Sequence, residues 1–185
     1  MQKLEYLEPK DLARIFRAFH ETESQRHHMA ALTAFFTSAR ISQVLALRGT
    51  DVFELGGKVV IKVGSAKRGH NGTYELYVHS DPAFDMTPLV EMAKRAGSNQ
   101  IFGGLTRQYF DIVIKRCSER AGIHESYAHS HMFRHSMAMV IMLHSTRVGA
   151  VSQFLLHRSA ASAFPYLAEN DGRYAQAAVN ALQFA

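Results

Sequence analysis

Residues 58–78 read KVVIKVGSAKRGHNGTYELYV, two short runs of alternating apolar residues around a centre rich in turn-forming residues. The alternating apolar positions are Val59, Ile61 and Val63 in the first run and Tyr74, Leu76 and Val78 in the second. A period of two is typical of strands, and the central glycines favour a turn. The stretch therefore predicts a β-hairpin with a long basic tip. Residues 51–55 supply a candidate third strand.

Most of the remaining chain shows the apolar spacing of helices. The predicted helices begin after Pro9 and near Ile41, and cover about 25–38, 106–122, 130–144, 146–157, a short stretch from Ser159, and 172–184. Helices around one small antiparallel sheet make an α+β domain. A length of 185 residues suits one such domain with a proper core.

The composition narrows the class of protein without deciding it. A formal charge of +5 permits a polyanionic partner. The single cysteine, Cys117, excludes an internal disulfide and a cysteine-rich zinc site, and its spacing from Phe110 and Val113 predicts a core position. No apolar run reaches the length of a membrane span, and the charged N-terminus lacks a signal-peptide core, so we expect no membrane partner and a cytoplasmic protein.

The most informative motif is His131-Met-Phe-Arg134-His135. On a helix these three polar residues lie on neighbouring turns of one side. The first turn of a helix favours an anion, so a phosphate there would meet an imidazole, a guanidinium and the helix dipole. Taken alone, the motif fits a capping histidine, a solvated arginine and a core histidine at least as well.

Two further stretches change that balance. Arg40 opens Arg-Ile-Ser-Gln-Val-Leu-Ala-Leu directly after a largely apolar helix. At this place a guanidinium is expected to be an inward-facing anion ligand, since a buried guanidinium needs a partner, although a surface arginine fits the position as well. Farther on, Leu155-Leu-His157 is followed nine positions later by Tyr166. Arg40 and His157 can bind a phosphate, and Tyr166 can attack one. Arg40 precedes the histidine–arginine motif in the sequence, and His157 and Tyr166 follow it.

In this order the motifs resemble the catalytic domain of the tyrosine recombinase (phage integrase) family over nearly the whole chain. The family's first arginine, hairpin lysine, histidine–arginine box, later histidine and tyrosine match Arg40, Lys67, His131 with Arg134, His157 and Tyr166. The resemblance implies a mainly helical α+β fold with a small three-stranded antiparallel sheet. It also implies a single catalytic domain over residues 1–185, without the N-terminal core-binding domain that typical members have, so we expect either a fragment of a longer protein or a single-domain member of the family.

The resemblance further implies a site-specific DNA recombinase or integrase that cleaves and rejoins DNA through a 3′-phosphotyrosyl intermediate. Tyr166 would attack the phosphate, both arginines and His157 would hold its oxygens, and His131 would assist proton transfer or donate to the phosphate. Lys67 would protonate the departing 5′ oxygen, with Lys62 or Arg68 as the alternatives to Lys67. Neither a metal nor another cofactor is required, because the ester energy is kept. The implied partners are double-stranded DNA and further copies of the chain, assembled as a tetramer on DNA.

Three residues depart from the family pattern. Gln43 replaces an acidic residue, although an amide can still hydrogen-bond. Leu156 replaces a glycine before His157, and Pro165 disfavours helix just before Tyr166. Tyr166 is therefore expected to begin a new turn or to lie on an irregular segment. Tyr174, the rival nucleophile, fits the spacing poorly.

Other readings remain open to different degrees. A non-catalytic DNA-binding relative and a type IB topoisomerase-like activity share most of these residues, although the apolar stretch 172–184 resembles a family helix that docks on a neighbouring protomer and so favours recombination. A zinc hydrolase is disfavoured because Met132 replaces the glutamate of HExxH, and His70-Asn71 excludes a P-loop. The remaining basic residues are either a DNA footprint or a solvated face: Lys62, Arg68, His70, Arg107, Lys115, Arg116 and Arg120.

Overall fold

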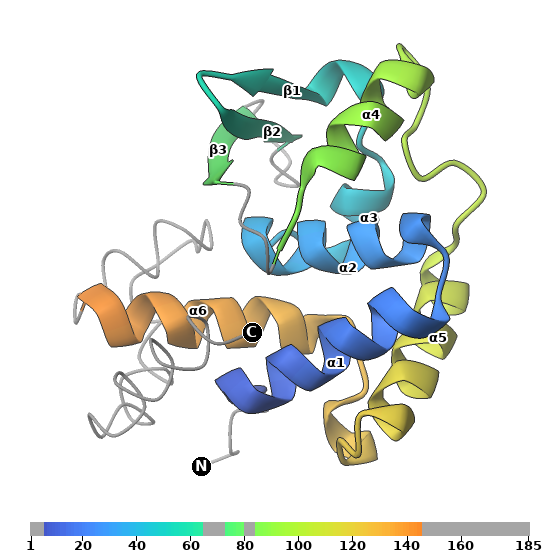
Figure 1. The fold of residues 1–185 in the computed structure, drawn as a ribbon, viewed down its shortest axis with the longest axis vertical. Helices are drawn as coiled ribbons and strands as arrows, with labels where there is room; N and C mark the ends of the chain where they lie inside the picture. The colour runs from blue at the N-terminus through green and yellow to red at the C-terminus, as the bar shows by residue number, and fades with distance from the viewer. Residues whose placement is uncertain (1–5, 65–72, 80–83, 146–185) are drawn as a thin grey trace.

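A computed structural model describes residues 6–64, 73–79 and 84–145 (Figure 1). The described elements are α1 (Pro9–Thr22), α2 (Gln25–Thr37), α3 (Ile41–Leu45), β1 (Val52–Leu55), β2 (Lys58–Gly64), β3 (Thr73–His79), α4 (Thr87–Ala96), α5 (Arg107–Arg120) and α6 (His131–Ser145). Short 3₁₀ turns cover Gly49–Asp51 and Glu125–Tyr127. The α+β fold class is confirmed. None of the helices in these ranges is both long and apolar enough to cross a bilayer.

The three strands form one antiparallel sheet in the order β1-β2-β3. Val59 pairs with Val78 across β2 and β3, and Val52 pairs with Ile61 across β1 and β2, so the predicted pairing of the hairpin strands and the third strand are confirmed. The predicted basic tip, residues 65–72, lies outside the described residues. Strand β2 is central, and Val60 is buried as well as its neighbours Val59 and Ile61. Both faces of this strand are therefore covered, which explains its nearly continuous apolar run.

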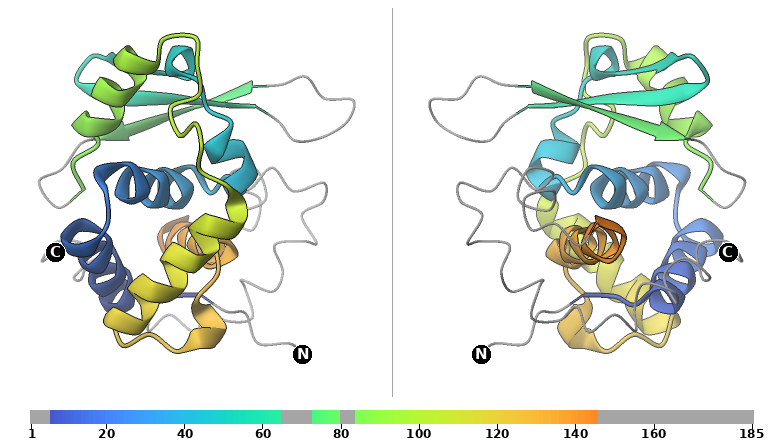
Figure 2. Two further views of the ribbon diagram at one scale, coloured as in Figure 1. Left: turned by 90° about the vertical axis from the view of Figure 1, so that its right-hand side faces the viewer. Right: turned by 90° about the vertical axis from the view of Figure 1, so that its left-hand side faces the viewer.

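Helix α4 was not predicted from the sequence. It packs beside β1 (Figure 2), burying Leu89, Val90 and Ala93. Pro88 in its first turn is one of the usual helix start signals, so the sequence carried a signal for this helix that the prediction missed. Gly49 fits closely against it: a Cβ at this position would lie 2.1 Å from the Ala93 carbonyl oxygen.

Helix α2 lies in the middle of the molecule, between the sheet with α4 on one side and α1 with α6 on the other (Figure 1). Its residues from Met29 to Phe35 are all buried. Small residues such as Ala30 and Ala34 let the surrounding helices approach closely. Packing against α2 thus holds α6 in place. The candidate site lies where α6 meets the C-terminal end of α2.

Candidate functional site

The end of α2 sets the direction of the chain that carries Arg40. Ser38, the C-cap residue, has a left-handed backbone (φ 49°, ψ 19°) and is fully buried. This conformation is uncommon for a residue with a Cβ and ends the helix abruptly. Arg40 follows as the N-cap of α3 with an extended backbone (φ −64°, ψ 143°), and its side chain is exposed. The expectation that this guanidinium faces inward is therefore wrong, because the Arg40 side chain lies on the surface at the start of a new helix.

Helix α6 brings its arginine to the same place. His131 is the first residue of α6, and Arg134 lies one turn further on. The Arg134 guanidinium donates through Nη1 to the carbonyl oxygen of Ser38 at 2.5 Å. Ser38 is two residues before Arg40, so this bond fastens α6 beside the start of α3. The two arginines singled out in the sequence are thus brought together by a bond between segments 96 residues apart.

His131 lies in a positive electrostatic environment. Partial desolvation is the main cause that lowers its pKa below the ordinary value of 6.5, and the charges of His129, Arg107, Arg134 and Arg40 lower the pKa further. The imidazole is therefore neutral at neutral pH and able to accept a proton. An anion among these cations would favour the charged imidazolium and raise the pKa of His131 again.

Arg107 and His129 belong to this cluster, although the sequence analysis named Arg107 only as a possible DNA contact and did not name His129. Arg107 is the first residue of α5, after the N-cap Thr106, whose hydroxyl accepts the Tyr109 N–H. Its side chain is mostly exposed and lies 3.7 Å from the Asp111 carboxylate. In the sequence Arg107 is one of several basic residues on a helix, and only the tertiary structure places it near His131.

Gln43 joins α3 to the sheet. Its Oε1 accepts the backbone N–H of Arg40 at 3.0 Å, and its Nε2 donates to the carbonyl of Gly64 at 2.6 Å. Gly64 is the last residue of β2. The expectation that an amide at position 43 can still hydrogen-bond is confirmed.

Several predicted site residues lie outside the described residues: Lys67, His157 and Tyr166, together with Leu156, Pro165 and Tyr174. Lys62, the alternative to Lys67, lies within β2. Its ammonium is 3.3 Å from Glu75 and 5.1 Å from the centre of the Phe53 ring. These contacts give Lys62 a cross-strand role. Arg68, the other alternative to Lys67, lies outside the described residues, so the choice of Lys67 stays a prediction.

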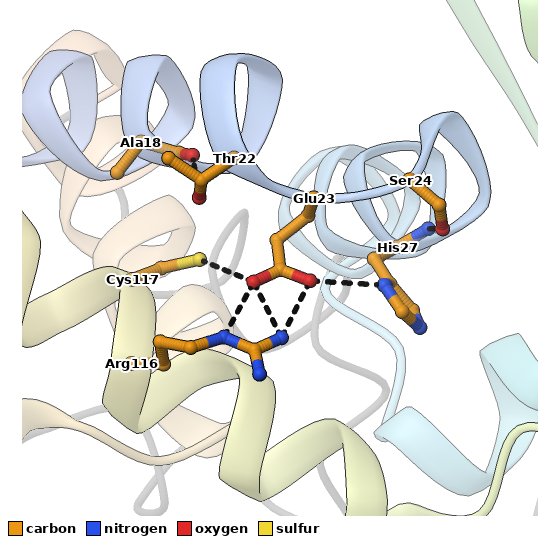
Figure 3. Close-up of polar contacts among 7 residues, drawn as sticks. All are labelled: Ala18, Thr22, Glu23, Ser24, His27, Arg116 and Cys117. Atoms are coloured by element: carbon orange, nitrogen blue, oxygen red, sulfur yellow. Dashed lines mark hydrogen bonds and ion pairs between the residues drawn. The ribbon is translucent and has the colours of Figure 1, made fainter.

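Arg116, which the sequence left as a possible DNA contact, pairs instead with Glu23 (Figure 3). Its Nε and Nη2 each donate at 2.7 Å to a Glu23 carboxylate whose side chain is 4% exposed. His27 lies 3.2 Å from the other side of the carboxylate. Burial and the nearby Glu23 carboxylate raise the pKa of Cys117 to about 11, so its thiol stays protonated and faces the carboxylate as a weak donor. The cluster links α1, α2 and α5.

We expect Arg116→Ala to lower the free energy of unfolding by about 2 kcal/mol, because the buried carboxylate loses two charge-assisted hydrogen bonds. The half-exposed guanidinium keeps the loss below that of a fully buried pair. Lys115→Ala, an exposed neighbour on the same helix, is the matched control and should change stability by less than about 0.5 kcal/mol. Urea unfolding of both variants measures this, and equal losses would contradict the role given to Glu23.

Within the described residues the arrangement gathers several cationic groups in one place, which suits an anion. Two guanidinium groups come from the start of α3 and the first turns of α6, with a neutral imidazole and a third arginine beside them. Guanidinium forks suit the oxygens of a phosphate. No group of three or more histidine, cysteine or acidic side chains is placed to hold a metal ion in the part of the chain that the structure describes.

Solved structures with the same fold include several recombinases and integrases. The chain is 19% identical to the site-specific recombinase XerH bound to its difH substrate in a pre-cleavage complex, with a TM-score of 0.73, covering 90% of this chain and 50% of that one. XerA recombinase gives 17% identity and a TM-score of 0.72, covering 100% and 64%. The catalytic domain of bacteriophage HP1 integrase gives 15% and 0.62, covering 96% and 95%.

The chain spans about half the length of XerH and nearly all of the isolated HP1 catalytic domain. Comparison with curated protein sequences gave no match. A family model described as "Phage integrase family" matches residues 5–173, which include all six predicted site residues. The chain therefore belongs to the phage integrase family, and its described part has the fold of a tyrosine recombinase catalytic domain.

Proposed function

We propose that the protein is a site-specific DNA recombinase that breaks and rejoins strands through a 3′-phosphotyrosyl intermediate on Tyr166. The observation that carries this proposal is the bond from Arg134 to the Ser38 carbonyl, which brings the histidine–arginine motif of α6 beside Arg40. Family membership supports the same reaction. The six proposed site residues are Arg40, Lys67, His131, Arg134, His157 and Tyr166.

The arginines stabilise the phosphate. In the transition state negative charge collects on the equatorial oxygens of the scissile phosphate, and donors fixed in advance lower the barrier. Arg134 is partly buried and already oriented by Ser38, whereas the Arg40 side chain is exposed and can reach the bound strand from the surface. His157 supplies a further donor to the same oxygens.

Two residues move the protons. A tyrosine hydroxyl has an ordinary pKa of about 10, so Tyr166 must lose its proton as it attacks. His131 is suited to accept this proton, because its lowered pKa keeps the ring neutral before the phosphate arrives. Lys67 protonates the departing 5′ oxygen, which leaves as a hydroxyl. The same proton transfers in reverse rejoin the strand.

The substrate we propose is double-stranded DNA, and the active assembly is a tetramer of this chain on that DNA. XerH, which has the same fold, is known in complexes with a difH substrate before and after cleavage. A net charge of +5 suits a polyanion. Neither a metal ion nor a nucleotide takes part, because the phosphotyrosyl bond conserves the energy of the phosphodiester.

The reaction class is tested by covalent trapping. The protein is incubated in EDTA with nicked duplexes drawn from the DNA that flanks its own gene, so that a short cleaved strand is lost and the intermediate accumulates. We expect a protein–DNA band that survives denaturant. Measurable DNA binding without any such band would favour a non-catalytic DNA-binding relative instead.

Arg107 should contact a phosphate next to the one that is cleaved. We expect Arg107→Ala to weaken DNA binding equally on different sequences and to reduce the slope of log affinity against log salt by about one. Lys94→Ala is the matched control, because this lysine already pairs with Glu91 on α4 at 2.7 Å. Fluorescence anisotropy over a salt series measures both variants. An unchanged slope for Arg107→Ala would remove Arg107 from the DNA interface.

A further inference from the structure

The Gln43 side chain accepts one hydrogen bond and donates another. It accepts from the backbone N–H of Arg40 at 3.0 Å and donates to the backbone carbonyl of Gly64 at 2.6 Å. Both partners are main-chain groups, so neither can turn away to find another partner. The side chain therefore spans the gap between the start of α3 and the end of β2.

Only a side chain with both a donor and an acceptor can make this bridge. A glutamine amide carries a carbonyl oxygen and an NH₂ group. An ionised glutamate of the same length offers acceptors only, so one oxygen could still accept from Arg40 but the other would face the oxygen of Gly64. The amide at position 43 thus matches its surroundings better than the acidic residue usual in the family.

We propose that Gln43 is a positioning residue, whose amide fixes the backbone of Arg40 relative to strand β2 and so aims the Arg40 guanidinium at the phosphate. The proposal rests on the function proposed above. Arg40 caps a helix of only five residues, which has little rigidity of its own. The hydrogen bond from Gln43 to Gly64 of β2 therefore holds the start of α3, where Arg40 lies, in a fixed position relative to the sheet.

This role predicts that restoring the family's usual acidic residue is harmful. We expect Gln43→Glu and Gln43→Met each to slow adduct formation at saturating protein about tenfold, while the affinity for DNA changes less than threefold. The methionine variant has a similar length and no charge, so it separates loss of the bridge from the added negative charge.

The pH profile distinguishes positioning from a general loss of stability. A protonated glutamic acid again has one donor and one acceptor, and its ordinary pKa is about 4.3. The ratio of the Gln43→Glu rate to the wild-type rate should therefore rise about twofold as the pH falls from about 7.5 to about 5. The Gln43→Met ratio should stay flat over the same range.

The bridge is also measured without any cleavage, by amide hydrogen exchange at Arg40. We expect its N–H to exchange about tenfold faster in Gln43→Met than in the wild type. Wild-type protein that forms no adduct would refute the proposed recombinase function. The exchange rate of the Arg40 N–H would then test by itself whether Gln43 forms the bridge. Unchanged exchange, or a Gln43→Glu variant as fast as wild type at neutral pH, would overturn the role of Gln43.

Discussion

Replacing Tyr166 by phenylalanine is expected to abolish the covalent protein–DNA adduct, a loss of more than about 10³-fold, while DNA binding is retained. The substitution removes only the hydroxyl that attacks phosphorus, and the remaining groups cannot replace a nucleophile. Denaturing gels of the trapped reaction measure the adduct, and anisotropy on the same DNA measures binding.

Tyr174→Phe is the matched control, because Tyr174 is the other tyrosine that follows His157 in the sequence. This variant should form the adduct at close to the wild-type rate. The opposite pattern, an adduct that persists in Tyr166→Phe and disappears in Tyr174→Phe, would move the nucleophile by eight positions. The nine-residue spacing between His157 and Tyr166 would then no longer indicate the nucleophile.

Arg40→Ala is expected to slow cleavage about 10²- to 10³-fold at saturating protein, the usual cost of losing one donor to the transition state. The fold should survive, because Arg40 is exposed and its bond to Gln43 uses the backbone N–H, which alanine keeps. Arg40→Lys should recover only part of the rate, because an ammonium cannot give two parallel hydrogen bonds.

Arg48→Ala provides the control for a lost positive charge near this helix. Arg48 is an exposed arginine eight residues further on, and its guanidinium donates to the Ser98 carbonyl at 2.6 Å rather than to the site. Its cleavage rate should stay within about threefold of wild type. Equal losses for the two variants would mean that Arg40 contributes only to the general attraction of DNA.

The sheet could be predicted from the sequence because its signals are local. Alternation over residues 58–63 and 73–78 and the turn formers between them specify a hairpin without reference to the rest of the chain. Helix α5 was equally readable, from the capping hydroxyl of Thr106 to Gly122, whose φ of 63° suits a residue just past a helix. Helix α4 was missed although Pro88 in its first turn and Gly97 at its end are signals of the same kind.

The site was only partly predictable, because its geometry depends on contacts between distant segments. The motifs identified Arg40, His131 and Arg134, but nothing in the sequence indicated that the Ser38 carbonyl would hold Arg134. The role of Arg107 beside His131 and the pairing of Arg116 with Glu23 were likewise hidden. A basic residue on a helix looks the same in sequence whether it faces DNA, a carboxylate or water.

The central claim is a covalent bond between the Tyr166 oxygen and a 3′ phosphate. The most direct measurement is mass spectrometry of the trapped adduct after protease and nuclease digestion, with labelling of the released DNA end by a polynucleotide kinase. We predict a peptide that carries a nucleotide on Tyr166 through its 3′ phosphate, and a partner strand whose 5′ end is a hydroxyl that accepts the label directly. A nucleotide on another residue, or a 5′ phosphate at the break, would contradict the account.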